Sequence, residues 1–310
     1  MEKQIKVSVW ITAYNHEKYI AEAIEGAINQ ITKFKFEIVI GEDYSFDKTR
    51  EICLNFQKKY PEKIKLILNE NNKGLIANYC DTLEQCSGKY IAQCDGDDYW
   101  IDPYKLQKQV DFLESNDDCA MVFTDKYAQQ NETIFKEKIK IFSDISFKSI
   151  LLSNMICSPT VLIRKDIINR YYNENAQIAL DRKWLTLDYP LWLEVSYNYK
   201  IGYIPEITSI YRVVSGSGSH GKDKLRSYQW DKCILDMQLF YYKKYFISNQ
   251  QSNVSFKYKF NEMLYHTRKR MLLDYGLIAK EQLKNLVFAN PLFLIYIVNQ
   301  KVKRTIFNNK

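Results

Sequence analysis

The segment KYIAQCDGDDYW (residues 89–100) carries three carboxylates within four positions, Asp95, Asp97 and Asp98, directly after a stretch typical of a buried β-strand. Like charges this close raise the energy of each ionised group unless a cation or hydrogen-bond donors compensate for them. A divalent ion that holds a phosphorylated ligand requires such oxygen ligands from a loop. Gly96 allows close approach, and in an extended backbone Asp95 and Asp97 face the same side. The cluster therefore predicts a Mg²⁺ or Mn²⁺ site. The alternative, turn residues bonded to their own backbone, is strongest for Asp98.

The elements that position this cluster are strands alternating with helices. Nearly continuous β-prone runs predict strands at 7–12, 36–40, 64–68 and 90–94. Apolar residues at three- and four-residue spacing predict helices over 20–28, 49–56, 75–86 and 105–115. Asn15 is expected to cap the first helix, and Asp102 with Pro103 to start the last. This alternation predicts an α/β fold with a mostly parallel, doubly wound sheet flanked by helices.

Polar residues follow each predicted strand. The four strands end at TAYN (12–15), GED (41–43), NENNKG (69–74) and DGDD (95–98). In open parallel α/β sheets, ligands bind in the crevice beyond the carboxyl ends of the strands. The sequence therefore predicts that these four groups meet at one edge of the sheet and form a ligand site there.

Composition excludes several classes of protein. With 310 residues, 46% of them apolar, the chain can bury a large core, so it is not expected to be disordered. The longest apolar run, 292–298, is too short to span a bilayer, and nothing at the start resembles a signal peptide, which favours the cytosol. Seven cysteines without a C-x-x-C pair indicate reduced thiols rather than zinc ligands or disulfides. His16 and His266 lack an acidic or cysteine partner nearby and are expected at the surface.

The charge is concentrated at the carboxyl end. Residues 221–310 hold 17 Lys and Arg against 6 Asp and Glu, a net charge of +11, whereas residues 1–220 carry a net −4. This basic, aromatic region has a helical pattern. It is typical either of a helical surface that adsorbs to anionic lipid headgroups or of helices that pack on the rest of the chain with solvated lysines. Nucleic-acid binding is disfavoured, because no recognised motif is present and the first part is acidic.

Several blocks of the chain, taken in order, resemble the family 2 glycosyltransferases, which have the GT-A fold and invert the anomeric centre. The blocks are VSVWITAYNHEKYIAEAIEGAINQ, EIVIGEDYSFDKT, NKGLIANY and KYIAQCDGDDYWIDPYKLQKQVDFLE. The resemblance is dense over about the first 115 residues and recurs at LDYPLWLE and YRVVSGSGS.

The resemblance implies where a nucleotide-sugar donor binds. The T-x-Y-N block implies that Thr12, Tyr14 and Asn15 line the nucleotide, with the Tyr14 ring against the base. Asp43 would accept a hydrogen bond from uracil, and Lys73 lies on the loop that flanks the nucleotide. In place of the family's paired acidic residues before Gly-Ser, this chain has EDYS at 42–45.

The acidic D-x-D motif is implied to hold both the donor and its metal. Asp95 would contact the ribose or the ion, and Asp97 would bind the Mg²⁺ or Mn²⁺ that carries the diphosphate. The metal would neutralise charge on the departing diphosphate.

An inverting displacement also needs a general base on the acceptor side, because a sugar hydroxyl is a poor nucleophile. The family carries this acid before an aromatic residue and a Leu-Trp-Leu helix. In the block TLDYPLWL (186–193) the matching residue is Asp188, and Leu187 stands where the usual Glu would be. The alternative is that Asp188 caps the helix that begins near Tyr189.

Four further residues are candidates for contacts with the acceptor or the phosphates. Asp98 and Trp100 follow the acidic motif, and the alternative for Trp100 is a place in the core. Arg212 has two alternatives, pairing with a phosphate or with a structural carboxylate. His220 ends the GSGSH stretch (216–220), which is either a lid over the donor or a linker.

We therefore expect a nucleotide-sugar-binding half at 1–115, an acceptor-binding half at 116–220 and a basic helical extension at 221–310. The expected activity is transfer of a sugar, from a UDP-sugar in particular, to a saccharide or lipid-linked saccharide in cell-surface polysaccharide synthesis. The expected location is the cytoplasm or the inner face of the membrane. Two alternatives stay open: a nucleotidyltransferase, which would not need Asp188, and a non-catalytic protein that binds sugar nucleotides or a membrane surface.

Overall fold

The computed structural model describes residues 4–136, 144–179, 181, 184–217, 223–247 and 254–275. The chain divides into two compact units, residues 1–220 and 221–310. The first unit contains the central sheet and the second contains two long helices.

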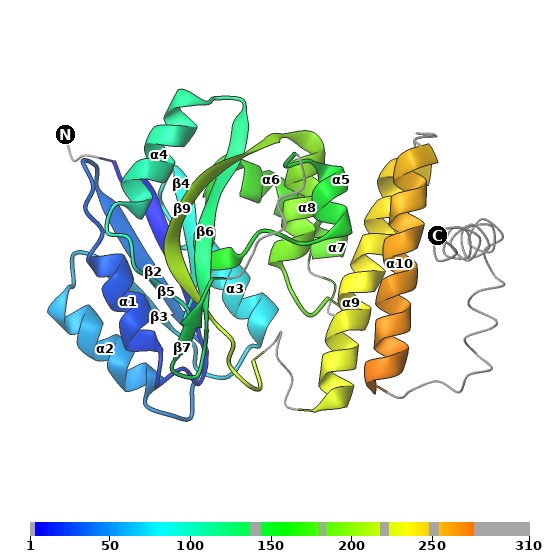
Figure 1. Cartoon of the computed structure of the whole chain (residues 1–310). Coiled ribbons are helices and arrows are strands. Elements are labelled where there is room, and N and C mark those ends of the chain that lie inside the picture. Colours follow the sequence, from blue (N-terminus) through cyan, green and yellow to red (C-terminus); the bar gives the residue numbers. More distant parts are fainter. Residues whose placement is uncertain are drawn as a thin grey trace. The chain divides into compact units, whose positions relative to one another are not determined.

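Nine strands in the described part of the first unit form one sheet, in the order β3-β2-β1-β4-β8-β6-β9-β5, with β7 paired to β6 (Figure 1). Strands β1 to β4 are all parallel, and β6 is parallel to β9. Strands β5, β7 and β8 pair antiparallel with their neighbours. The predicted α/β fold with a mostly parallel sheet is confirmed. The strands are β1 Val7–Ala13, β2 Phe36–Glu42, β3 Ile64–Leu68, β4 Tyr90–Asp95, β5 Tyr99–Trp100, β6 Cys119–Gln130, β7 Thr133–Phe135, β8 Val161–Arg164 and β9 Lys200–Arg212.

Helices flank this sheet. In Figure 1, α1 and α2 lie on one side of it and α6 and α8 on the other. The first four predicted helices are confirmed to within three residues at each end. The helices of the unit are α1 Ile20–Ile28, α2 Thr49–Lys59, α3 Leu75–Glu84, α4 Lys105–Ser115, α5 Phe147–Leu152, α6 Lys165–Glu174, α7 Ala176–Ala179 and α8 Asp188–Asn198, with a 3₁₀ turn η1 at Ser158–Thr160.

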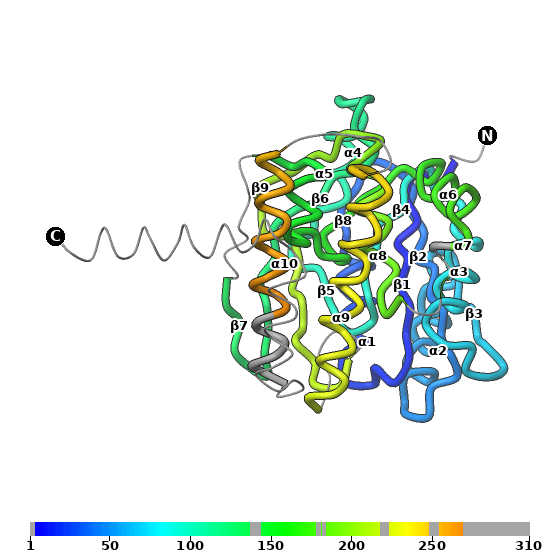
Figure 2. The backbone as a smooth tube through the Cα atoms, turned by 90° about the vertical axis from the view of Figure 1, so that its right-hand side faces the viewer, coloured from blue at the N-terminus to red at the C-terminus, as the bar shows by residue number. Residues whose placement is uncertain are grey.

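The innermost strands are mostly apolar because helices cover both faces of the sheet. In β1, Val7, Val9 and Ile11 point into one layer of the core and Trp10 into the other, and all are buried. Figure 2 shows β1 running beside β2. Since β1 to β4 are parallel neighbours, their carboxyl ends meet at one edge of the sheet, as the sequence predicts.

Two predicted helix starts need correction. Asn15 does not cap α1, because α1 begins at Ile20 after Tyr19, and the Asn15 side chain instead accepts a hydrogen bond from the amide of Phe46. Helix α4 begins at Lys105, and Asp102 accepts the amide hydrogen of Tyr104 (2.8 Å) in the turn before it. In both cases the polar residue satisfies a backbone amide, but in a turn rather than at the helix itself.

The second unit is a pair of helices. Helix α9 (Lys224–Tyr242) is capped by Asp223, which accepts the amide hydrogen of Arg226 (2.8 Å), and a π-helical turn, Lys243–Ile247, extends it. Helix α10 (Val254–Tyr275) packs against α9, and the ring of Tyr242 stacks on that of Phe260 at 4.1 Å between centroids. The predicted helical extension is confirmed for these residues. Among the helices that the structure describes, none is long and apolar enough to cross a membrane.

All seven cysteines are free, and each is buried or half-buried. The prediction of reduced, mostly buried thiols agrees with this arrangement.

Candidate active site

The acidic turn begins where β4 ends. Thr12 of β1 lies opposite Asp95 of β4 in the parallel register. The amide of Gly96 donates to the carbonyl oxygen of Thr12 (3.0 Å), and the amide of Asp98 donates to the carbonyl oxygen of Asp95 (3.0 Å). These bonds fix the turn at the edge of the sheet. Asp95 and Asp97 are half-buried there.

Asp95 is held in a strongly negative environment. Its Oδ2 accepts a hydrogen bond from the hydroxyl of Ser158 (2.6 Å), in the turn η1. Burial, followed by the negative charges of Asp97 and Asp188, raises the pKa of Asp95 from 3.8 to about 7. Burial and the two neighbouring carboxylates thus both disfavour the ionised form of Asp95.

Asp98 has a different role from its two neighbours. It is buried, and its Oδ1 accepts the amide hydrogen of Arg212 (2.8 Å). Burial and the charges of Asp97 and Asp95 raise its pKa well above the usual value. With 1% of its surface exposed and its carboxylate bonded to the Arg212 amide, Asp98 is placed to support the turn rather than to contact the acceptor or the phosphates.

Arg212 ties the acidic turn to the rest of the unit. One guanidinium nitrogen donates to the carbonyl oxygen of Asp97 (2.9 Å), and another pairs with Glu22 of α1 (2.8 Å). The guanidinium also lies 4.2 Å from the ring centroid of Tyr99. Of the two alternatives for Arg212, the contact present in the structure is with a structural carboxylate.

His16 packs against the acidic turn from the loop after β1. A Cβ atom on Gly96 would lie 2.6 Å from Nδ1 of His16 and 2.9 Å from the carbonyl oxygen of Thr12. That Nδ1 atom is buried and has no hydrogen-bond partner among the described residues. The expectation that His16 is a surface group is thus wrong for this side of the ring. This close packing also explains why residue 96 is a glycine, because the imidazole of His16 occupies the space that a side chain at position 96 would need.

Asp188 is the first residue of α8. Its Oδ1 accepts the amide hydrogen of Tyr189 (2.7 Å) and the hydroxyl hydrogen of Thr186. Burial raises the pKa of this carboxyl above its usual value. The negative charge of Asp188 in turn helps to raise the pKa of Asp95, so the two carboxyls, 93 positions apart in sequence, lie within electrostatic reach of each other. The cap position of α8 is Leu187 and has no side-chain cap bond, so Asp188 lies within the first turn of the helix and is not its cap.

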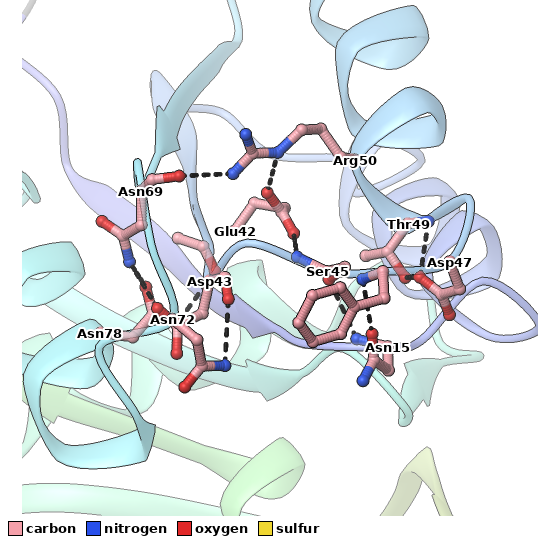
Figure 3. A network of polar contacts seen from close by, with 12 residues as sticks. Asn15, Glu42, Asp43, Ser45, Asp47, Thr49, Arg50, Asn69, Asn72 and Asn78 are labelled. Carbon is pink, nitrogen blue, oxygen red and sulfur yellow. Dashed lines mark hydrogen bonds and ion pairs between the residues drawn. The ribbon is translucent and has the colours of Figure 1, made fainter.

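Asp43, at the end of β2, organises the loop that follows β3. Its Oδ1 accepts from the amide of Lys73 (2.9 Å) and from the side chain of Asn69 (2.8 Å), and its Oδ2 accepts from the amide of Gly74 (2.9 Å). The side chain of Asn72 donates to the carbonyl oxygen of Asp43 (3.2 Å) (Figure 3). The carboxylate therefore already has protein donors on both oxygens.

Glu42 is buried beside this network. It pairs with Arg50 of α2, and its Oε1 accepts the amide hydrogen of Ser45 (2.7 Å). Arg50 also donates to the carbonyl oxygen of Asn69 (2.6 Å) (Figure 3). The Glu42–Arg50 pair thus joins the ends of β2 and β3 to α2.

The remaining candidates are placed as follows. The ammonium of Lys73 pairs with Asp81 (2.5 Å), and Tyr14 is exposed at the end of β1. Trp100 is 4% exposed and donates to the carbonyl oxygen of Pro159 (2.8 Å), so it belongs to the core and offers no face to a sugar. His220 lies outside the described residues.

The donor set fits a nucleotide-bound metal ion. Within the residues that the structure describes, no group of three or more His, Cys, Asp or Glu side chains is arranged to hold a metal on its own. A Mg²⁺ ion that travels with a diphosphate needs only one or two carboxylates, because phosphates and water complete its shell. Asp95 and Asp97 provide those two carboxylates from a single turn, where both side chains are half-buried.

Sequence reasoning missed the residues that support the turn. Ser158 and His16 contact it from separate parts of the chain, and Glu22 pairs with Arg212, which bonds to it. No local spacing marks Ser158 or Glu22, and only the glycine in the acidic motif points to a neighbour as close as His16.

Comparisons with known proteins agree with this geometry. The model of the family described as "Glycosyl transferase family 2" matches residues 8–172. An uncharacterized protein of Mycobacterium tuberculosis is 31% identical over 66% of this chain and 58% of its own length, so the chain spans less than two thirds of that relative. The UDP-Glc:alpha-D-GlcNAc-diphosphoundecaprenol beta-1,3-glucosyltransferase WfgD of Escherichia coli is 29% identical over 73% of this chain and 84% of its own.

The fold is also found among solved structures. The crystal structure of Staphylococcus aureus TarS 1-349 in complex with UDP matches 91% of this chain and 78% of its own, with a TM-score of 0.59 and 17% sequence identity. At this identity the likeness establishes the fold alone.

Proposed function

The chain belongs to the family 2 glycosyltransferases, and from this premise we propose that it is a metal-dependent, inverting enzyme that uses a nucleotide sugar, in particular a UDP-sugar. The observation that carries the proposal is the placement of three carboxyl groups: Asp95 and Asp97 lie in one turn after β4, and Asp188 begins α8. Burial, followed by the charges of Asp97 and Asp188, raises the pKa of Asp95, so all three groups are within electrostatic reach of one another. A metal-binding pair and a candidate base are thus close together at the carboxyl edge of the sheet.

Asp95 and Asp97 would hold a Mg²⁺ or Mn²⁺ ion together with the diphosphate of the donor. When bound, the ion would neutralise charge on the departing nucleoside diphosphate. The protein's contribution is to keep the two carboxylates in place: Ser158 holds Asp95, and Arg212 holds the backbone at Asp97. Thr12, Asn15 and Lys73 lie on the strand-end loops that would surround the nucleotide.

Asp188 would remove the proton from the acceptor hydroxyl as the bond to the sugar forms. Burial raises the pKa of this carboxyl, which makes it a stronger base than an exposed aspartate. The hydrogen bonds from Thr186 and Tyr189 go to Oδ1 and fix the orientation of the group. A single displacement by the acceptor oxygen inverts the anomeric centre, so no covalent intermediate with the protein is needed.

The acceptor is proposed to be a saccharide or lipid-linked saccharide in cell-surface polysaccharide synthesis. The name of the E. coli relative describes such an acceptor, a sugar on diphosphoundecaprenol. Work on a lipid-linked acceptor would place the enzyme at the cytoplasmic face of the membrane. The net charge of +11 on residues 221–310 supports contact of this region with anionic lipids.

The test is incubation of the full chain with a panel of radiolabelled nucleotide sugars and polyprenyl-linked acceptors, with Mn²⁺ or with EDTA. We expect sugar transfer, or slow donor hydrolysis without acceptor, only in the presence of the metal. Release of pyrophosphate from a nucleoside triphosphate would instead indicate a nucleotidyltransferase. Donor binding without turnover under all conditions would indicate a binding protein.

A further inference from the structure

The loops that follow β1 and β2 are fastened to each other. The amide of Asn15 donates to the hydroxyl of Ser45 (3.0 Å), and the Asn15 side chain accepts the amide hydrogen of Phe46 (3.0 Å) (Figure 3). Three further bonds connect the same two loops: His16 N to Thr49 Oγ1 (2.7 Å), Glu17 N to Asp47 Oδ2 (3.0 Å) and Lys48 N to Glu17 Oε2 (3.1 Å). We call residues 14–17 and 44–49 the paired loops. Their mutual bonds hold their side chains in fixed positions relative to each other.

Each of the paired loops has a residue in the left-handed region. Asn15 has φ = 56° and Tyr44 has φ = 59°. Asparagine tolerates this conformation, whereas a bulky aromatic residue there is an outlier that marks strain. Glycine would be the unstrained choice at this position. Strained residues of this kind persist mainly where they serve a function.

The strain presents aromatic rings to solvent. Tyr14, Tyr44 and Phe46 are 39%, 41% and 78% exposed. The ring of Phe46 has edge contacts with both tyrosines, at 6.4 Å to Tyr14 and 6.1 Å to Tyr44 between centroids. The guanidinium of Arg50 lies over the Tyr44 ring at 5.2 Å, which supports that ring from α2. The result is a contiguous aromatic surface beside Asp43, at the edge where a nucleotide would bind.

The adjacent carboxylate has limited capacity to recognise a base. Both oxygens of Asp43 already accept hydrogen bonds from the loop after β3, from Asn69, Lys73 and Gly74. Stacking on an aromatic face, in contrast, requires no free hydrogen-bonding group and tolerates every base, because each has a π-face.

We propose that Tyr44 and Phe46 extend the surface of Tyr14 into an aromatic wall for the donor's base, and that stacking on this wall, rather than hydrogen bonding to Asp43, supplies most of the affinity for the base. The inference rests on the proposed function, since it assigns a ligand to the same donor site. It makes base selectivity weak, so UDP and GDP should bind with affinities within about tenfold of each other.

The test is calorimetric titration of the full chain with UDP, GDP and pyrophosphate in Mn²⁺. Tyr44→Gly and Phe46→Ser should each weaken UDP and GDP binding about tenfold and leave pyrophosphate binding unchanged, because pyrophosphate has no base to stack. Tyr104→Ser is the matched control. Tyr104 is also exposed, but it lies beside Pro103, whose carbonyl accepts from Ile31 beyond the far end of α1. This control should bind all three ligands normally.

Thermal melting separates a ligand role from a structural one. Tyr44→Gly relieves the left-handed strain, so its Tm should not fall although its UDP affinity does. Three results would contradict the proposed aromatic wall. They are unchanged UDP affinity in both variants, a loss of pyrophosphate binding equal to the loss of UDP binding, and a change confined to the KM for the acceptor. An Asp43→Asn variant that loses UDP selectively over GDP would also contradict it. If the unaltered protein binds no nucleoside diphosphate, both the proposed function and the aromatic wall are wrong. The results above would contradict the wall alone.

Discussion

Gly96→Ala should damage the acidic turn through lack of space. The added Cβ would lie 2.6 Å from Nδ1 of His16, about 0.8 Å short of the 3.4 Å at which ordinary contact begins. It would also lie 2.9 Å from the carbonyl oxygen of Thr12, which belongs to the central strand β1 and accepts the amide hydrogen of Gly96. The imidazole is packed against the turn and must rotate to relieve the first contact, and the strand cannot yield to the second. The turn itself must therefore move.

Overpacking of this kind costs about 1–3 kcal/mol of stability. For a unit of this size we expect the Tm to fall by roughly 2–4 °C per kcal/mol. A displacement approaching 1 Å at a catalytic group can reduce a rate by about 10²-fold. Since Asp95 and Asp97 flank Gly96, we expect Gly96→Ala to lower kcat/KM by about 30- to 100-fold.

The assay combines Mn²⁺-dependent UDP titration, donor turnover and thermal melting for Gly96→Ala, His16→Ala and the double variant. His16→Ala removes the closer of the two contacts, so the double variant should regain part of the lost stability and UDP affinity. A coupling of about 1 kcal/mol between the two sites is expected. Additive effects, or a Gly96→Ala protein with normal melting and activity, would refute the reasoning.

Asp97→Asn should abolish Mn²⁺-dependent UDP binding, because it removes an anionic ligand; unchanged affinity in a calorimetric titration would remove Asp97 from the site. Asp188→Asn should reduce turnover by about 10²–10⁴-fold with UDP affinity intact, and equal loss of both would indicate a structural role. The pKa of Asp95 is raised to about 7, so the folded protein holds this proton more tightly than the unfolded chain does. Without ligand, the protein should therefore lose stability relative to Asp95→Asn as the pH rises from about 4 to about 7; a Tm difference that is flat over this range would contradict the assignment.

The first half of the fold was predictable because burial imposes a simple pattern. Strands such as Val7–Ala13 are covered on both faces, so their sequences are mostly apolar and β-prone. The antiparallel strands β5 and β8 were not predictable in this way, because their pairing partners lie far away in sequence. Short strands of this kind carry no periodicity of their own, and their direction is decided by tertiary packing.

The candidate site also has a part that the sequence predicts and a part that it does not. The acidic motif and its place at a strand end follow from local spacing, whereas the partners of its residues do not. Arg212 and Asp98 are 114 positions apart, and Ser158 and Asp95 are 63 apart. Asn15 is an example of what residue type cannot predict. Asparagine is typical of a helix cap, but its side chain here accepts a hydrogen bond from the amide of Phe46 on another loop. Such a choice depends on which segments the fold brings together.

The bonding between the paired loops has a consequence for chimeras between relatives. Asn15 and Glu17 supply partners for amides of the second loop, and Ser45, Asp47 and Thr49 supply partners for amides of the first. A graft of one segment alone would leave amides on the other without acceptors. Recombination that aims to change donor preference should therefore move both segments together as one cassette.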